Sequence, residues 1–303
     1  MTRTFVIGAR GSKLSRAQVQ LVVDALRVWW PDVAIEVREI KTEGDRGAAP
    51  LSQIGGLGVF TKAIEDALLA GTIDIAVHSL KDLPPRLPDG LTLAAIPERA
   101  DVRDALVTRD GRTLAELPPG ARIGTGSERR AVQITALRTD IEPVEIRGNV
   151  PTRIAKVESG NYDAAVLAVA GLDRLGLHAK IAQTFTIEEM CPAAGQGALG
   201  IEVRADDAET IDLVRQIDHP DTHVAVTAER AFLDRLGAGC RMPVGAYATA
   251  SGDTLVIRGI IGSDSGIISR HELRGPVADA RAIGDALADA MLATAAVANG
   301  VEQ

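Results

Sequence analysis

One cysteine of this chain lies in a segment that a packed core would not need. Cys240 stands in "GAGCRMPVG", residues 237–245, among three glycines, one alanine and one proline, with Arg241 directly after it. Small neighbours leave room beside a thiol, and an adjacent guanidinium favours the nucleophilic thiolate. On residue type alone, an inert thiol in a turn is the simpler interpretation.

Six arginines lie next to turns or where a strand-like run passes into a helical one. Guanidinium groups bind carboxylates through paired hydrogen bonds, so this placement in an acidic chain favours a ligand with several carboxylates. Any one of them, taken singly, is more simply a surface ion-pair partner of little energetic weight. The six are Arg10, Arg129, Arg130, Arg147, Arg153 and Arg174.

Polar residues also follow the strand-like run "IDIAVHSL", residues 73–80. Lys81 and Asp82 stand before a proline-rich loop, where neither a helix nor a central strand can continue. The carboxyl ends of strands in an α/β sheet face the ligand crevice, so Asp82 is a candidate general acid or counter-charge for a cation. The alternative is a Lys–Asp turn that caps backbone groups, and His78 is most simply a hydrogen-bonded histidine at a strand end.

The order of the elements indicates how these residues are positioned. Apolar strand-like runs alternate with helical patterns, which is typical of a sheet flanked by helices. The predicted strands are 4–9, 33–40 and 73–80, and the predicted helices are 15–28 and 59–70.

Two pairs of segments repeat along the chain. One pair shares a glycine followed by Asp, Ala and Val at the third, fifth and sixth positions; the other reads strand, glycine turn, serine and arginine-rich helix. The pairs are 71–83 with 160–175 and 7–18 with 123–133. They predict two similar lobes, in which Ser12 and Ser127 cap helices whose N-termini favour anions. Ordinary N-caps with solvated arginines are the alternative.

Composition excludes several classes of protein. The net charge of −8 and 3% aromatic content argue against nucleic-acid binding. No long uncharged apolar run is present, and the first ten residues do not read as a secretory signal, so we expect a cytoplasmic protein without membrane contact.

The sequence also gives little indication of a metal site or of disulfide bonds. Two cysteines cannot form a disulfide framework, and Cys191 is expected to behave as a small apolar residue. His219 and His223 lack a third ligand, so we expect no metal site there. We interpret that stretch as an interdomain linker before a helix that begins at residue 223.

Several motifs together resemble the porphobilinogen deaminase family, also called the hydroxymethylbilane synthases. They occur in the family's order and spacing from about residue 5 to 247: "RGSKLSRAQ", "FTKAIEDALLAGTIDIAVHSLKDLP", "GTGSERR", "RGNVPTRIAKVESGNYDAAVLAVAGLDRLGL", "PAAGQGALGIE" and "ERAFLDRLGAGCRMPVGA". The resemblance implies a transferase that condenses four porphobilinogen molecules, releasing ammonia, into a linear tetrapyrrole in haem-type biosynthesis.

The same resemblance implies roles for individual residues. Cys240 would carry a dipyrromethane cofactor through a thioether, Asp82 would be catalytic, and Phe60 would lie on a loop near the site. Gln53 and Leu57 stand where many members have lysines, which puts two auxiliary cationic contacts in doubt. Cofactor binding is implied for Ser12, Lys81, Asp82, Thr125, Ser127, Arg129, Arg130, Arg147 and Gly148, and substrate binding for Arg10, Ser12, Ser79, Arg147, Arg153, Arg174 and Gln196.

The fold implied by the resemblance is α/β with three domains, in a monomer. The first two domains are periplasmic-binding-protein-like lobes around a cleft, and the third is a smaller α+β domain with an antiparallel sheet and helices. Lobe 1 is 1–98 plus 197–217, lobe 2 is 99–196, and the cofactor-attachment domain is 218–303.

Within the third domain the residues suggest particular elements. Segments 253–263 and 266–275 read as an antiparallel pair, and 277–298 reads as a covering helix. We expect Ile283, Leu287 and Met291 of that helix to face inward.

Two other classes of protein fit part of these observations. A solute-binding protein for anions also has two lobes with anion-binding turns, but it predicts an export signal and needs neither Cys240 nor Asp82. A regulatory ligand-sensing domain would bring a helix-turn-helix segment or a basic patch, and none is found in the sequence. The enzyme is therefore the favoured interpretation.

Overall fold

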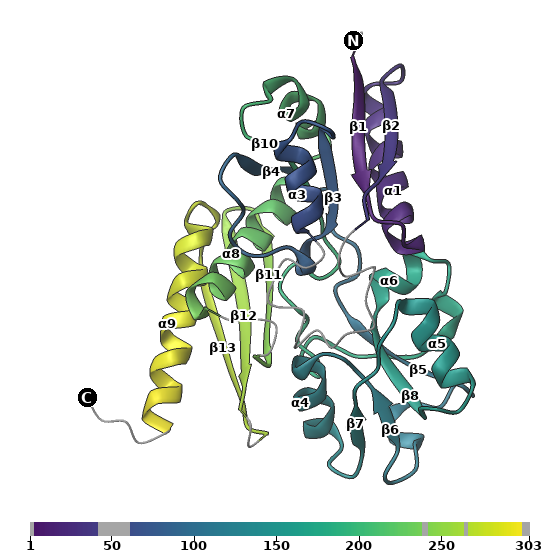
Figure 1. Ribbon diagram of the computed structural model, residues 1–303. Coiled ribbons are helices and arrows are strands. Elements are labelled where there is room, and N and C mark those ends of the chain that lie inside the picture. Colours follow the sequence, from purple (N-terminus) through teal and green to yellow (C-terminus); the bar gives the residue numbers. More distant parts are fainter. Residues whose placement is uncertain (1–2, 42–60, 238–241, 264–265, 299–303) are drawn as a thin grey trace. The chain divides into compact units, whose positions relative to one another are not determined.

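The computed structural model (Figure 1) describes residues 3–41, 61–237, 242–263 and 266–298. These residues form two five-stranded sheets and one three-stranded sheet, together with helices. The predicted α/β class with a smaller antiparallel sheet is thereby confirmed.

Contacts within the chain group it into two units, which are described separately below. The first unit is Met1–Arg99 with Ala198–His223, and the second is Ala100–Gly197 with Val224–Gln303. The second unit holds one five-stranded sheet and the three-stranded sheet.

The sheet of the first unit has the strand order β2-β1-β3-β10-β4. The first three strands are parallel, and β10 runs antiparallel to both of its neighbours. Helices α1 and α7 pack on one face of this sheet and α3 packs on the other. The bounds are β1 Thr4–Ala9, α1 Lys13–Trp29, β2 Ala34–Glu39, α3 Lys62–Leu69, β3 Ile75–Ser79, β4 Leu91–Ala95, β10 Leu199–Arg204 and α7 Ala208–Arg215.

The five-stranded sheet of the second unit repeats this plan in the order β7-β6-β8-β5-β9. Three strands are again parallel, and β5 is antiparallel to both neighbours, as β10 is in the first unit. The predicted duplication of the lobe is confirmed. The bounds are β5 Asp104–Thr108, β6 Arg122–Gly124, α4 Glu128–Leu137, β7 Glu142–Val144, α5 Val150–Glu158, β8 Ala164–Ala168, α6 Val169–Arg174 and β9 Ile181–Thr184.

The repeated aspartate has the same structural role in both sheets. Asp74 Oδ2 accepts a backbone N–H of β1 at 2.9 Å, and Asp163 Oδ2 accepts a backbone N–H of β6 at 2.8 Å. Each follows a glycine with positive φ, 67° at Gly71 and 80° at Gly160, a conformation that residues with a Cβ avoid. The glycine ends a helix, and the aspartate fixes the start of the next parallel pair of strands.

The three-stranded antiparallel sheet carries α8 and α9 on one face. The predicted pair of strands is confirmed as β12 and β13, and Ile283, Leu287 and Met291 of α9 are buried as predicted. The helix itself starts at Ala280, after a 3-10 turn. The bounds are α8 Pro220–Leu236, β11 Val244–Ser251, β12 Thr254–Gly262, β13 Ile268–Pro276 and α9 Ala280–Ala298.

Two features of this region differ from the sequence-based expectation. Strand β11 was not predicted, because its small residues "VGAYATAS" follow the cysteine loop without a clear alternation. The linker interpretation of the stretch around His219 and His223 is wrong, since α8 already begins at Pro220. Proline is favoured in the first turn of a helix, where its missing N–H has no intrahelical partner to lose.

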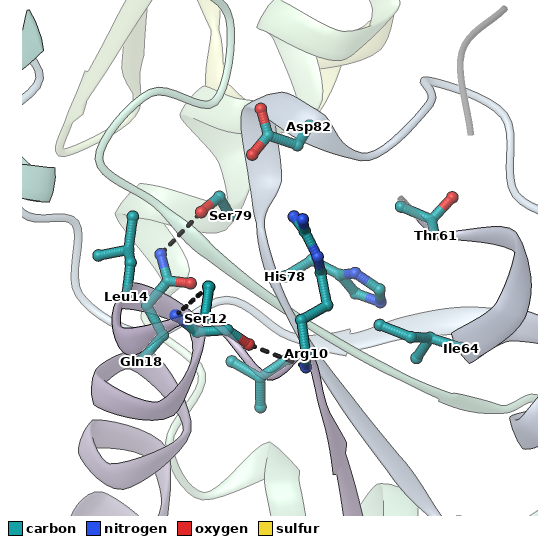
Figure 2. Close-up of a pocket in the computed structure, with 11 residues that line it drawn as sticks. Arg10, Ser12, Leu14, Gln18, Thr61, Ile64, His78, Ser79 and Asp82 are labelled. Carbon is teal, nitrogen blue, oxygen red and sulfur yellow. Dashed lines mark hydrogen bonds between the residues drawn. The ribbon is translucent and has the colours of Figure 1, made fainter. Parts of the chain in front are cut away.

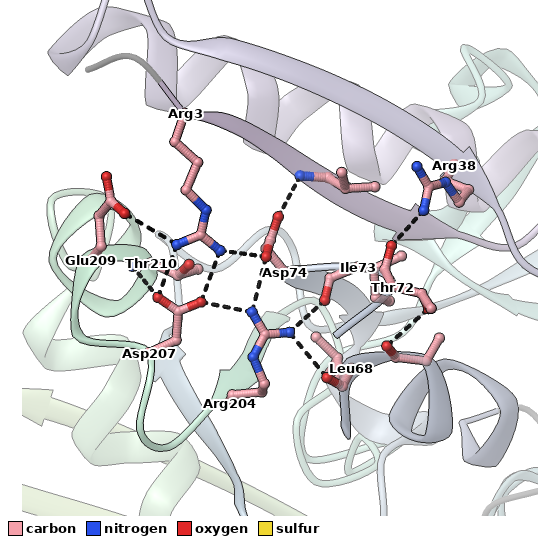
Figure 3. Close-up of polar contacts among 12 residues, drawn as sticks. Arg3, Arg38, Leu68, Thr72, Ile73, Asp74, Arg204, Asp207, Glu209 and Thr210 are labelled. Carbon is pink, nitrogen blue, oxygen red and sulfur yellow. Dashed lines mark hydrogen bonds and ion pairs between the residues drawn. The ribbon is translucent and has the colours of Figure 1, made fainter. Parts of the chain in front are cut away.

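An ion-pair network lies at the amino ends of β1 and β3 (Figure 3). Arg204 Nη2 is 2.9 Å from Asp74 Oδ1 and 2.7 Å from Asp207 Oδ2, and Arg3 contacts the same two carboxylates. Burial alone would raise the pKa of Asp207, but hydrogen bonds from Arg3, Thr210 and Arg204 outweigh burial and hold that pKa well below its usual value.

We predict that Asp207→Asn lowers stability in a pH-dependent way. Because the folded-state pKa of Asp207 lies below the unfolded value of about 3.9, the carboxylate stabilises the fold above about pH 4, and this contribution is lost as the pH falls further. Urea unfolding at neutral pH should show that the free energy of unfolding of Asp207→Asn is about 2 kcal/mol below that of wild type. This difference should become smaller below about pH 4.

Glu209→Gln is the matched control for that variant. Glu209 contacts the same Arg3, but its side chain is 49% exposed, so the loss should stay below about 0.5 kcal/mol. A difference between Asp207→Asn and wild type that is constant from neutral pH to about pH 3 would contradict the assignment.

Candidate functional site

A pocket in the first unit lies at the carboxyl ends of β1 and β3 (Figure 2). Arg10 directly follows β1, Ser12 precedes α1, Ser79 is the last residue of β3, and Asp82 lies on the 3-10 turn Leu80–Asp82. All four side chains line this pocket. Four residues singled out from the sequence are therefore brought together, although β1 and β3 are far apart along the chain.

Helix α1 positions the hydroxyl groups of the pocket. Ser12 Oγ accepts the backbone N–H of Ser15 at 3.2 Å, so the predicted N-cap is confirmed, and Ser15 Oγ accepts the backbone N–H of Arg10 at 3.1 Å. Gln18 Nε2 donates to Ser79 Oγ at 2.7 Å. Because Ser79 accepts this bond, its own O–H proton is left to donate toward a ligand.

The wall of the pocket includes His78 at the end of β3. Its Nε2 lies 3.0 Å from Glu202 Oε2 on β10, and both side chains are buried. The predicted hydrogen-bonded histidine is confirmed. Lys81 is exposed on the turn that carries Asp82, and it is not among the residues that line the pocket.

In the second unit, the turn between β6 and α4 carries Thr125 and Ser127. Thr125 is buried, and its Oγ1 accepts the backbone N–H of Ser127 at 3.2 Å. Ser127 stands at the N-cap position of α4, but its side chain makes no capping hydrogen bond in the described structure. The predicted N-cap position of Ser127 is therefore confirmed, but the residue supplies only the extended backbone of a cap and not a side-chain hydrogen bond.

Arg129 and Arg130, on the first turn of α4, are buried beside Asp104 of β5. Arg130 Nη2 lies 2.6 Å from Asp104 Oδ1 and Arg129 Nη2 lies 2.9 Å from Oδ2, while Gln196 Nε2 donates to Oδ1 at 2.9 Å. Burial lowers the pKa of Arg129, and the Asp104 carboxylate opposes this. Two cations share one carboxylate here, so the group keeps an excess of positive charge.

The loop after β7 and the helix α5 that follows it contain three of the candidate residues. Arg147 Nη2 lies 2.5 Å from Glu145 Oε1, and Arg153 Nε donates to the carbonyl of Gly148 at 2.8 Å. Gly148 has a φ of 110°, and an added Cβ would lie 2.7 Å from Thr152 Cγ2. Only glycine suits this position, which holds the loop between the two arginines.

Arg174 ends α6 and is largely enclosed. Its Nη2 donates to the carbonyl of Gly197 at 2.6 Å, but its Nε is buried without a hydrogen-bond partner in the part of the chain that the structure describes. Burial lowers the pKa of Arg174. A buried cation of this kind suits a carboxylate from a ligand.

Some candidate residues lie outside the described residues, namely Cys240, Arg241, Phe60, Gln53 and Leu57. Cys191 is buried, with 2% of its surface exposed, and burial raises the pKa of its thiol to about 12. This agrees with the expected behaviour as a small apolar residue.

Metal-binding groups and membrane-spanning helices were also considered for the described residues. The described residues contain no group of three or more His, Cys, Asp or Glu side chains arranged to hold a metal ion. Among the helices of the described ranges, none is both long and apolar enough to cross a membrane.

Two family models match successive parts of the chain. Residues 5–212 match the family model of the porphobilinogen deaminase dipyromethane cofactor binding domain, and residues 223–293 match that of the porphobilinogen deaminase C-terminal domain. Porphobilinogen deaminase of Roseiflexus sp. (strain RS-1) is 50% identical, covering 96% of this chain and 97% of the relative. The enzyme of Brevibacillus brevis is 47% identical over 96% and 94%.

Among solved structures, the likeness is more distant. The methionine binding protein MetQ aligns with a TM-score of 0.46 and 13% identity, covering 71% of this chain and 89% of that protein.

We predict that Cys191 is unreactive in the native protein. In a Cys240→Ser variant it is the one remaining thiol of the sequence. Because its pKa is raised to about 12 and its side chain is buried, an aromatic disulfide reagent should modify it at least about a hundredfold more slowly in the native than in the urea-unfolded protein. Similar rates in the two states would show that the thiol is accessible.

Proposed function

This chain belongs to the porphobilinogen deaminase family, and we propose which of its residues carry out the family's reaction. The chain is a transferase that condenses four porphobilinogen molecules, releasing ammonia, into the linear tetrapyrrole hydroxymethylbilane. Its residues 5–212 form a dipyrromethane cofactor binding domain. The binding-protein and ligand-sensing alternatives considered from the sequence are set aside on this ground.

The described residues fit a cofactor that carries several carboxylates. Arg174 has a buried Nε without a partner in the described structure, and Arg129 and Arg130 share the single carboxylate of Asp104. When bound, the dipyrromethane supplies the free pyrrole carbon to which the first substrate unit is joined. We assign cofactor binding to Ser12, Lys81, Asp82, Thr125, Ser127, Arg129, Arg130, Arg147 and Gly148.

Porphobilinogen carries an acetate and a propionate on its ring, so it also needs cationic and hydroxyl partners. We assign this role to residues on both units. They are Arg10, Ser12, Ser79, Arg147, Arg153, Arg174 and Gln196.

The catalytic carboxylate in this proposal is Asp82. Loss of ammonia from porphobilinogen leaves a cation, and formation of the new carbon–carbon bond leaves a second cation that must lose a proton. A carboxylate stabilises positive charge on the pyrrole nitrogens and exchanges protons with them. The observation that supports this role is the pocket that Asp82 lines together with Arg10, Ser12 and Ser79.

The domain boundaries, the cellular location and the oligomeric state are also part of the proposal. We propose the division into 1–98 with 197–217, 99–196 and 218–303, since each part carries a sheet of its own. We further propose a cytoplasmic monomer, with Phe60 near the site. A reducing compartment suits Cys240, because that thiol must be free before it forms a thioether.

The attachment of the cofactor to Cys240 is tested by the intact mass of denatured protein. We expect wild-type protein to exceed its sequence mass by two porphobilinogens less two ammonias, and Cys240→Ser to show the bare sequence mass. Cys191→Ser is the matched control and should keep the full excess, since Cys191 is buried in the core. An excess that survives in Cys240→Ser, or that disappears in Cys191→Ser, would refute the assignment.

A further inference from the structure

The histidine on the wall of the Asp82 pocket is held by a buried carboxylate. His78 Nε2 lies 3.0 Å from Glu202 Oε2, and the two residues are 6% and 0% exposed. An ionised carboxylate accepts the Nε2 proton, which fixes the neutral imidazole in the tautomer whose Nδ1 is an acceptor. The pair thus has the arrangement of a histidine base oriented by an acidic residue.

The acceptor nitrogen of this histidine is available to the pocket. In the described part of the chain no side chain or backbone group is hydrogen-bonded to His78 Nδ1, and Nδ1 is not one of the fully enclosed unpaired atoms. His78 lines the same pocket as Arg10 and Asp82, and Figure 2 shows its ring beside the Arg10 side chain, on the side of Ile64 and Thr61. A proton donor bound in the pocket can therefore reach the imidazole directly or through one water.

Buried carboxyl groups on two elements lie beside the imidazole. Glu202 Oε1 has no hydrogen-bond partner in the described structure, so the contact of Oε2 with His78 is the hydrogen bond that this side chain makes there. Glu65 of α3 is also buried, and burial, with a smaller contribution from Glu202, raises its pKa toward the neutral form. The other charged groups near His78 are Arg10 and Asp82, of opposite sign, in the pocket.

We propose that His78, oriented by Glu202, is a second proton acceptor of the active pocket, beside Asp82. This inference rests on the proposed binding of substrate at that pocket. In each condensation a carbon–carbon bond forms at a pyrrole carbon, and that carbon then loses its proton. Nδ1 takes the proton, the C–H electron pair restores the aromatic ring, and the proton passes on to the released ammonia or to water. No oxidation or reduction is involved, and Asp82 is left to stabilise the cationic nitrogens.

The test compares cofactor-loaded wild type with His78→Gln, using porphobilinogen that carries deuterium at its free ring carbon. We expect His78→Gln to be about a hundredfold slower, with a deuterium isotope effect clearly larger than that of wild type, because proton removal becomes rate-limiting. Glu202→Gln should lose rate in the same direction but less, since Nδ1 is kept. A purely structural role would leave the isotope effect unchanged.

The possible outcomes separate this inference from the function itself. Intact mass and melting temperature identify variants that have lost the cofactor or the fold. Chemical rescue is a second readout: imidazole added to a His78→Gly variant should restore part of the rate. A loaded, folded His78→Gln with the wild-type rate, or a slow one with the wild-type isotope effect, would overturn the inference. Wild-type protein that forms no hydroxymethylbilane would instead overturn the proposed function.

Discussion

The second unit encloses more guanidinium groups than it has carboxylates to pair with them in the described structure. The rest of the site depends on this excess of positive charge. Arg129, Arg130 and Arg174 are all largely enclosed, and Asp104 is the one carboxylate paired with any of them in the described structure. Burying a guanidinium costs free energy unless hydrogen bonds and an opposite charge compensate it. The fold supplies part of that compensation, and in the proposed function a ligand rich in carboxylates supplies the rest.

The segment that leads from β9 to β10 provides several of the hydrogen bonds that compensate these enclosed charges. The carbonyl of Cys191 accepts from Arg129 Nη1 at 2.6 Å, and the carbonyl of Gly197 accepts from Arg174 Nη2 at the same distance. Gln196, on the same segment, donates to Asp104. Gly197 has a φ of 86°, and an added Cβ would lie 2.5 Å from the carbonyl of Ala100, so the close approach of this backbone depends on glycine.

The duplicated lobes use one plan for two purposes. In both, a strand leads through a glycine turn to a helix, and a buried glutamine of that helix, Gln18 or Gln133, bonds to a neighbouring segment. After the third strand they diverge. The first lobe continues from β3 into the turn that carries Asp82, whereas the second continues from β8 directly into α6 and ends at Arg174. The first lobe thus carries Asp82, to which we assign the reaction, and the second carries the enclosed cations.

Local pattern was enough to predict much of this architecture. The strand at 4–9, the repeated lobes and the inward face of the last helix all follow from periodicity and turn residues that neighbour one another in the chain. Arg10, Ser12, Ser79 and Asp82, which line one pocket, were singled out in the same way, because strand ends are visible in sequence. The roles of Asp104 and Glu202 were missed. Asp104 begins an apolar strand and Glu202 lies within one, and the partners of both come from elements far away in the sequence that no local signal reveals.

The most direct test of the account is the ladder of enzyme-bound additions, read by intact mass after cofactor-loaded protein is mixed with porphobilinogen. The account predicts successive one-unit additions in wild type, and in Asp82→Asn a ladder that stops at the unelongated cofactor or grows at least about a hundredfold more slowly. Asp82→Glu, which keeps the carboxylate, should elongate faster than Asp82→Asn. Elongation of Asp82→Asn at the wild-type rate would contradict the assignment of the chemistry to this pocket.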